Sequence, residues 1–186
     1  QGIAHDVFFD VCLNGNNGFA VGVIGTVAES VDAGVTWKRM DPITTSSLLG
    51  VSCDGPNPIV VGQEGAVLVK KGDEWHRVPA VTQQRLMSVG ANKSGLAVAV
   101  GAFGSVVVSK DGGDTWTPVS IAWEPILNDF NEPHMYDAKV SADGVMTIVG
   151  EFELVLRSED AGDTWTVVHK GDKSLFSLHF RDANNG

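Results

Sequence analysis

An eight-residue string recurs along this chain and limits its possible folds more than any other feature. The string reads Ser-x-Asp-x-Gly-x-Thr-Trp and occupies residues 30–37, 109–116 and 158–165. A degenerate copy at residues 70–75 keeps the tryptophan and loses most of the rest. The four tryptophans are 38, 41 and 49 residues apart. This period is typical of small supersecondary units that stack side by side and share one continuous core.

A second string, centred on glycine, recurs in phase with the first. Each copy is a β-branched run, a tight turn and another β-branched run, which is the pattern of a β-hairpin. The copies occupy residues 21–27, 61–67, 100–106 and 149–155. One more short apolar run precedes each hairpin, at residues 7–13, 48–53, 86–91 and 135–140, and a fifth lies at 175–180. No segment has a convincing helical period.

The two strings together predict an all-β fold, a β-propeller of four-stranded antiparallel blades. In each blade, strand A precedes a hairpin of strands B and C. The eight-residue string, which we call the Asp-box, forms the turn that leads from strand C to strand D. The expected blades cover approximately residues 5–40, 48–79, 86–119 and 135–169, with the start of a fifth at 174–186. A closed four-bladed ring is possible, but the first blade already has its own strand A, so the last strand would be redundant there. We therefore expect a single propeller segment of a larger ring, which further blades or self-association would complete.

The Asp-box is expected to be a structural device. Its aspartate can accept bonds from the backbone amides that follow, its glycine permits backbone angles that a side chain would obstruct, and its tryptophan should be largely buried between sheets. These residues are Ser30, Asp32, Gly34, Trp37, Ser109, Asp111, Gly113, Trp116, Ser158, Asp160, Gly162 and Trp165. A calcium loop would need further oxygen ligands where the tryptophans stand, so we expect no metal and no cofactor.

Charge and hydropathy exclude several classes of protein, and the two cysteines give a further expectation. The net charge of −10 argues against a nucleic-acid partner, whose phosphates require a basic face. No apolar run approaches the roughly 20 residues of a membrane-spanning helix. Cys12 and Cys53 lie in equivalent strands of adjacent repeats, one position out of phase. Because successive side chains point to opposite faces of a strand, we expect two buried thiols and no disulfide.

The Ser-x-Asp-x-Gly-x-Thr-Trp boxes combined with the Val-Gly-x-x-Gly-x-Val hairpins resemble the photosystem II stability/assembly factor family of propellers over essentially the whole chain. The resemblance implies a non-catalytic scaffold in an extracytoplasmic location (periplasmic, lumenal or secreted). It also implies a protein partner, such as a membrane protein or its assembly intermediate. An arginine-rich patch is associated with the photosynthetic members, whereas this chain has five arginines: Arg39, Arg77, Arg85, Arg157 and Arg181.

A carbohydrate-active enzyme is the alternative, because Asp-boxes also occur in sialidases and in some endoglucanase propellers. A sialidase-like site needs clustered arginines and a tyrosine nucleophile paired with a glutamate. Tyr136 is the single tyrosine, and no acidic pair has a diagnostic context for hydrolysis by two carboxylates. We expect no enzymatic activity.

A partner should bind the side of the blades that carries the B–C hairpins and the D–A connections, since the Asp-boxes occupy the other side. The connection after the third blade contains an insertion, residues 120–134, with two aromatic residues among acids. Loops on rigid scaffolds commonly carry function. The expected partner-binding residues are Trp123, Phe130, Phe103, Phe152, Glu151, Gln63 and Glu64. Alternatively, the apolar residues of the insertion fold back and cap the core.

Overall fold

The computed structural model describes residues 7–128 and 132–180. It contains four separate antiparallel sheets of four strands each, and within every sheet the strands are neighbours in chain order. Short turns between β-branched runs favour this arrangement, because antiparallel neighbours need only a tight connection. Within the described residues, no helix has the length and apolarity that crossing a bilayer requires.

Each blade is one of these sheets. The first comprises β1 (Phe8–Asn14), β2 (Asn17–Gly22), β3 (Val27–Ser30) and β4 (Lys38–Arg39). The second comprises β5 (Leu48–Ser52), β6 (Ile59–Gly62), β7 (Val67–Lys71) and β8 (Glu74–Arg77). The third comprises β9 (Leu86–Ala91), β10 (Ala97–Gly101), β11 (Val106–Ser109) and β12 (Thr117–Pro118). The fourth comprises β13 (Met135–Val140), β14 (Met146–Gly150), β15 (Val155–Ser158) and β16 (Thr166–His169).

Within residues 7–128 and 132–180, helical structure is confined to short pieces. The 3-10 turns η1 (Val23–Gly25) and η2 (Gln63–Gly65) form the tips of the first two B–C hairpins. One α-helix, α1 (Trp123–Leu127), lies in the insertion after the third blade. The sequence showed no helical period there, because a helix of five residues is too short to establish one.

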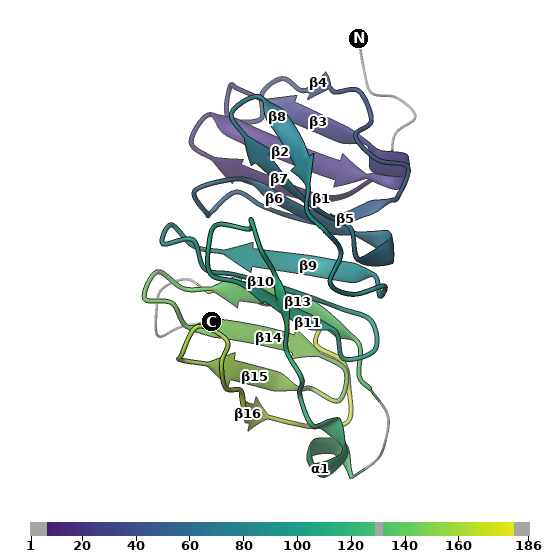
Figure 1. Cartoon of the computed structure of the whole chain (residues 1–186), viewed down its shortest axis with the longest axis vertical. Coiled ribbons are helices and arrows are strands. Elements are labelled where there is room, and N and C mark those ends of the chain that lie inside the picture. Colours follow the sequence, from purple (N-terminus) through teal and green to yellow (C-terminus); the bar gives the residue numbers. More distant parts are fainter. Residues whose placement is uncertain (1–6, 129–131, 181–186) are drawn as a thin grey trace.

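The four blades stack in chain order along the long axis of the molecule (Figure 1). The first blade, in purple, and the fourth, in green and yellow, lie at opposite ends of the stack. The stack is not closed into a ring. This confirms the predicted fold class, an open segment of a β-propeller with four-stranded blades.

The core lies between the sheets. One cluster of buried side chains joins the first two blades, a second joins the middle two, and a third joins the last two. Leu48, Leu86 and Met135, the first residues of strand A in blades two to four, are fully buried and belong to these three clusters in turn. Each sheet is therefore stabilised mainly by its neighbours, as expected of a stacked repeat.

The segment at residues 175–180 was expected to be the strand A of a fifth blade. It forms no ladder, and an isolated bridge joins the preceding Ser174 to Glu151. It nevertheless lies against the fourth blade, where the Leu178 amide donates to Asp137 Oδ2 at 2.9 Å. An equivalent bond joins the Val51 amide of the second blade to Asp10 Oδ2 of the first, at 2.8 Å. The segment is thus positioned as a strand A, and ladder pairing would require a strand B of its own sheet.

The two cysteines form a disulfide, and the expectation of free thiols was wrong. Cys12 and Cys53 are joined across the first and second blades, with their Cα atoms 5.7 Å apart. Side chains one position out of phase do point to opposite faces of equivalent strands. In stacked sheets, however, the face of one sheet that points to the next blade packs against the opposite face of that next sheet. Opposite orientations therefore bring the two sulfurs together.

The box tryptophans are less uniformly buried than expected. Trp116 is 6% exposed and packs in the cluster between the second and third blades. Trp37 and Trp165, in the two end blades, are half-buried. Burial of an identical motif residue thus depends on where its blade stands in the stack.

Candidate functional site

The three intact eight-residue turns share five side-chain hydrogen bonds, and the first two turns have a further bond from the aspartate amide to the serine hydroxyl. In the third turn the Thr164 amide donates to Asp160 Oδ1 at 2.8 Å, and the Gly162 amide donates to Ser158 Oγ at 2.8 Å. The Trp165 indole donates to the Gly162 carbonyl at 3.1 Å. Bonds from the Thr164 hydroxyl and amide hold the pKa of Asp160 down to about 2. Because this carboxylate is occupied by its own turn, it is not free for chemistry.

Asp32 and Asp111 are held in the same way. The Thr36 amide donates to Asp32 Oδ1 at 2.8 Å, and the Thr115 amide donates to Asp111 Oδ1 at 2.9 Å. The Thr36 hydroxyl is the main reason that the pKa of Asp32 is lowered. The candidate site therefore lies elsewhere, on the hairpin side of the blades.

Each B–C hairpin holds a non-glycine residue in the left-handed region of backbone space at one equivalent position, and the fourth hairpin holds a second, Glu153 with φ of 48°. The equivalent residues of the four blades are Ile24, Glu64, Phe103 and Phe152, with φ of 50°, 57°, 52° and 58°. This conformation strains L-residues, and most of all a β-branched one such as isoleucine. Glycine would relieve the strain. None of the four equivalent positions carries glycine.

Three of these four side chains are large and apolar, and they face solvent. Ile24 is 66% exposed, Phe103 55% and Phe152 37%. Exposed apolar groups on neighbouring turns of a rigid scaffold are a common feature of protein-interaction surfaces. We call these four residues the hairpin-tip row.

An aromatic row continues from Phe103 across the fourth blade. The ring of Phe103 meets His134 edge-on at 5.1 Å between centroids, and His134 lies 6.5 Å from Tyr136. Tyr136 in turn lies 4.9 Å from Phe176, which is largely exposed. Aromatic rings provide large contact areas with few rotatable bonds, so they are favoured at interfaces.

Glu151 and His134 fix the geometry of this row. Glu151 Oε2 accepts the backbone amide of His134 at 2.7 Å, and Oε1 accepts the Tyr136 hydroxyl at 3.4 Å. The Phe103 amide donates to His134 Nδ1 at 3.1 Å, so that ring nitrogen is the acceptor. Burial and the neighbouring Glu151 raise the pKa of Tyr136, and Arg85 opposes them. The tyrosine therefore stays protonated.

The residues that the sequence nominated for partner binding lie in different surroundings. Phe103, Phe152, Gln63 and Glu64 are on exposed hairpin tips, and Glu64 accepts the Ser46 hydroxyl at 3.0 Å. Glu151 is partly buried and holds its neighbours in place.

The proposed role of Trp123 as an exposed anchor is not supported by its position. Trp123 is 7% exposed and packs in the cluster between the third and fourth blades. An added Cβ on Gly104 would contact its indole nitrogen, so the ring covers the third hairpin closely. Ile126 and Leu127 pack against the same cluster. This part of the insertion caps the core, because its apolar side chains can cover a cluster that the short strands leave open. Phe130 lies outside the described residues.

Sequence reasoning missed four members of the site: Ile24, His134, Tyr136 and Phe176. Ile24 could have been found, since it occupies the same hairpin position as Phe103 and Phe152. The other three come together only because β13 and residues 175–180 run side by side.

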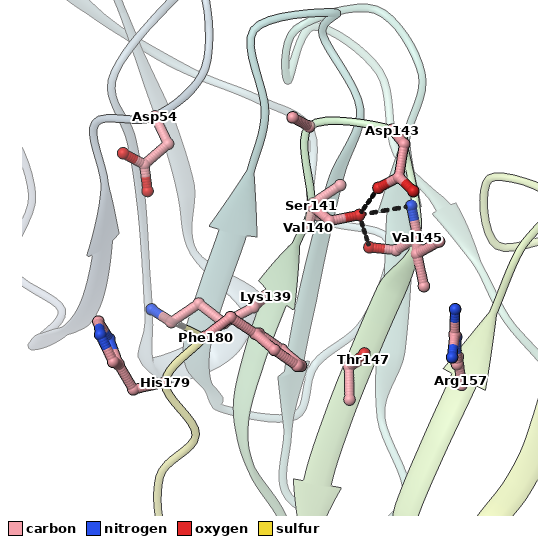
Figure 2. A pocket seen from close by; sticks show the side chains of 11 residues that line it. Asp54, Lys139, Val140, Ser141, Asp143, Val145, Thr147, Arg157, His179 and Phe180 are labelled. Carbon is pink, nitrogen blue, oxygen red and sulfur yellow. Dashed lines mark hydrogen bonds between the residues drawn. The ribbon is translucent and has the colours of Figure 1, made fainter. Parts of the chain in front are cut away.

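A pocket of about 590 Å³ lies between the open face of the fourth blade and Asp54, which follows strand A of the second blade. Figure 2 shows Thr147, Arg157, Lys139, His179 and Phe180 around it, with Asp143 held by Ser141 at its rim. It is separate from the aromatic row, since no residue of that row lines it.

Comparisons with known proteins support the fold. No family model and no curated protein sequence matches the chain. Among solved structures, YCF48 bound to D1 peptide is 20% identical with a TM-score of 0.63, covering 87% of this chain and 53% of that one. YCF48 from Cyanidioschyzon merolae is 22% identical with a TM-score of 0.64, covering 87% and 56%. An ancestral GH74 enzyme is 14% identical with a TM-score of 0.65, covering 89% of this chain and 26% of that one.

These likenesses are at the level of fold. The chain spans about half the length of the two YCF48 structures, by the 53% and 56% of those chains that it covers. The propeller of this chain thus resembles that of YCF48, a photosystem II assembly factor.

Proposed function

We propose that this chain is a non-enzymatic propeller scaffold that binds another protein through the hairpin side of its blades. The observation that carries the proposal is the hairpin-tip row. Exposed apolar side chains occupy strained positions on equivalent turns, where they remove little apolar surface from water. The aromatic row extends this surface to Phe176 and provides rigid contact area.

The location and class of partner are part of the same proposal. A disulfide between blades is favoured outside the cytosol, where thiols are not kept reduced. One structurally similar propeller, YCF48, is seen bound to a D1 peptide. We propose an extracytoplasmic scaffold whose partner is a membrane protein or an assembly intermediate of one.

Glycine substitution separates a binding role from a structural role. We expect Phe103→Gly and Ile24→Gly to leave the free energy of unfolding unchanged or to raise it by up to about 1 kcal/mol, because glycine relieves the left-handed strain. Phe103→Gly also keeps the backbone amide that bonds His134. Both variants should lose the partner in crosslinked pull-downs from the native extract.

Val31→Ala is the matched control. Val31 is also exposed and apolar, but it belongs to the eight-residue turn on the other side of the first blade. It should retain the partner. If the glycine variants unfold more readily, or if they retain the partner and Val31→Ala loses it, the hairpin side is not the binding surface.

A glycoside hydrolase is the second candidate, and the contact between Tyr136 and Glu151 is the observation that favours it. A tyrosine nucleophile needs a lowered pKa, however, and the pKa of Tyr136 is raised. We expect no release of sugar from sialosides or xyloglucan. Turnover by the wild type that Tyr136→Phe abolishes would favour the enzyme instead.

A further inference from the structure

Each strand A contains a β-bulge at its second residue. In the first blade the ladder passes from Phe8 to Asp10 and leaves Phe9 between them without a partner. The same shift of register occurs in the other three blades, where the residues without a ladder partner are Leu49, Met87 and Tyr136. A bulge bends its strand and re-aims the side chain of the extra residue. The four bulges therefore re-aim four equivalent side chains.

The bulge residues are all large and apolar or aromatic. Phe176 occupies the corresponding place in the segment at residues 175–180, since it stands two residues before the Leu178 amide that bonds the fourth blade. Phe9 and Phe176 are 51% and 69% exposed, and the other three are half-buried. The residues that precede the bulge in the inner blades are fully buried: Leu48, Leu86 and Met135. We call the following five residues the bulge row: Phe9, Leu49, Met87, Tyr136 and Phe176.

The bulge row lies on the hairpin side of the blades, because each strand A begins there. The hydroxyl of Tyr136 donates to Glu151 Oε1 in the fourth hairpin at 3.4 Å. The ring of Tyr136 also lies 6.5 Å from His134, which accepts the amide of the hairpin-tip residue Phe103. The hairpin side therefore carries two lines of apolar side chains, the hairpin-tip row and the bulge row.

Neighbouring members of the bulge row are close together. The ring centroids of Tyr136 and Phe176 are 4.9 Å apart. Directly after the bulges of the second and third blades, a Cβ on Gly50 would lie 2.9 Å from the Cα of Ser88, so these strands are in contact. Side chains three or four positions apart on a helix are about 5–6 Å apart, whereas side chains on one face of an extended strand are about 6.5 Å apart. The row thus matches the apolar face of a helix more closely than that of a strand.

The loops around the two rows are acidic. Among the described residues, the hairpin tips and the D–A connections carry the bases Arg85, Lys170 and Lys173. The acids of the same loops are Asp41, Glu64, Glu124, Glu132, Glu151, Glu153 and Asp172. Glu132 is exposed, and it lines a groove of about 240 Å³ together with Phe103. A segment that crosses the bulge row meets an excess of negative charge, which favours a basic segment.

We infer that the bulge row is the docking site for a basic amphipathic helix of the partner protein. The inference rests on the proposed function, since it names the kind of segment that the hairpin side binds. The apolar face of the helix contacts the bulge row, and its basic side chains face the acidic loops.

Two labelled peptides of about 14 residues, roughly four helical turns, test the inference. Both contain leucine and lysine in equal number, but one has leucine at the helical period and the other alternates leucine with lysine, which favours a strand. Fluorescence anisotropy measures their binding to the full chain. We expect the helical-period peptide to bind about tenfold more tightly than the alternating one. The helical-period peptide with glutamate in place of lysine should not bind.

Variants of the chain locate the contact. Phe176→Ser and Met87→Ser should each weaken the helical-period peptide about five- to tenfold, because each removes an apolar anchor. Val35→Ser is the control, since Val35 is exposed in the eight-residue turn on the other side of the first blade. Glu132→Gln should weaken binding of the lysine peptide, and Arg85→Gln should strengthen it, each by about two- to fivefold, the range for an exposed ion pair.

Equal binding of the alternating or the glutamate peptide overturns the inference, as does no binding of the helical-period peptide at millimolar concentration. Binding that Phe176→Ser and Met87→Ser leave unaltered also overturns it. The proposed function is tested separately by the native partner. If Phe103→Gly loses that partner while Phe176→Ser and Met87→Ser retain it, the hairpin side remains the binding surface and the bulge row is not its helix site.

Discussion

At the scale of single residues, the equivalent tryptophans of one motif contribute differently to the stability of the fold. The tryptophans of the three intact turns donate the same indole bond to their turn glycine. Trp116 alone among them is buried, between the two middle blades, whereas Trp165 is half-buried against the cluster between the last two and Trp37 is half-buried in the first blade. The motif determines the local turn, and the neighbouring blade determines how much apolar surface the ring removes from water.

Trp116→Ala should cost about 3–5 kcal/mol of unfolding free energy, the range for deleting a large buried aromatic ring. Trp37→Ala is the matched control, since it removes the same ring and the same indole bond at an end of the stack. We expect a clearly smaller loss there, measured by urea denaturation. Equal losses would show that the turn, and not burial between blades, makes the contribution.

Asp10 and Asp160 should give pH dependences of opposite sign. Burial raises the pKa of Asp10 above its ordinary 3.8 despite the amides of Val51 and Val11. The stability that its protonated form contributes is present below 3.8 and is lost as pH rises through the folded value. The advantage of wild type over Asp10→Asn should therefore be larger at pH 3 than at pH 7.

Asp160 is the opposite case. Its pKa falls from 3.8 to about 2, so its contribution is present above 3.8 and is lost as pH falls toward 2. The advantage of wild type over Asp160→Asn should be larger at pH 7 than at pH 2. Unfolding curves across this range measure both variants. If the advantage of wild type changed with pH in the same direction for both variants, the opposite pKa shifts of Asp10 and Asp160 would be contradicted.

At the scale of elements, the strands A of successive blades are tied together across blade boundaries. The disulfide joins β1 to the residue that follows β5. The side-chain amide of Asn14, at the end of β1, also donates to the Cys53 carbonyl at 2.9 Å. Asn92 makes the same kind of bond to Ser141, at 2.8 Å, between the third and fourth blades. These bonds hold each end blade against its neighbour.

Reduction of the disulfide should lower the free energy of unfolding by about 2–4 kcal/mol, as expected for a closed loop with a sequence separation of 41 residues. The measurement is urea denaturation with and without dithiothreitol. In the control, Cys12→Ser combined with Cys53→Ser, the reductant should have no effect. A wild-type midpoint that reductant leaves unchanged would mean that the bond does not constrain the unfolded chain.

At the scale of the whole molecule, the open stack leaves its first sheet with one uncovered face. Val11 of β1 is 56% exposed, whereas its equivalents Val51, Val89 and Ala138 are buried. Phe9 and Leu13 of β1 are exposed beside it. These side chains repeat the pattern of an inner blade, so the first sheet is suited to a neighbour on this side as well.

Val11→Lys should change the unfolding free energy by no more than about 0.5 kcal/mol, because the side chain is already in water. Val89→Lys at the equivalent position, 3% exposed, should prevent folding or cost several kcal/mol, since it buries an unpaired charge. Thermal unfolding and sedimentation compare the two. A large loss for Val11→Lys, together with a change in mass, would show that this face is covered in solution.

The sequence by itself determined the repeating unit. Turn glycines, the Ser-x-Asp-x-Gly-x-Thr-Trp strings and the β-branched runs act over a few residues, so strands β9 and β13 could be predicted residue for residue. The all-β class and the open segment followed from counting these units. The exposed positions of Phe103 and Phe152 also followed, because a tight hairpin projects its tip into solvent.

Only the tertiary structure decided which side chains meet across two neighbouring blades. The disulfide, the burial of Trp123 and the aromatic row through His134, Tyr136 and Phe176 all depend on how one sheet lies on the next. Alternation along a strand gives the face of a side chain but not the identity of the group opposite it. That identity is set by the stacking of sheets whose contacting residues are about 40 positions apart, as for Cys12 and Cys53 with a separation of 41.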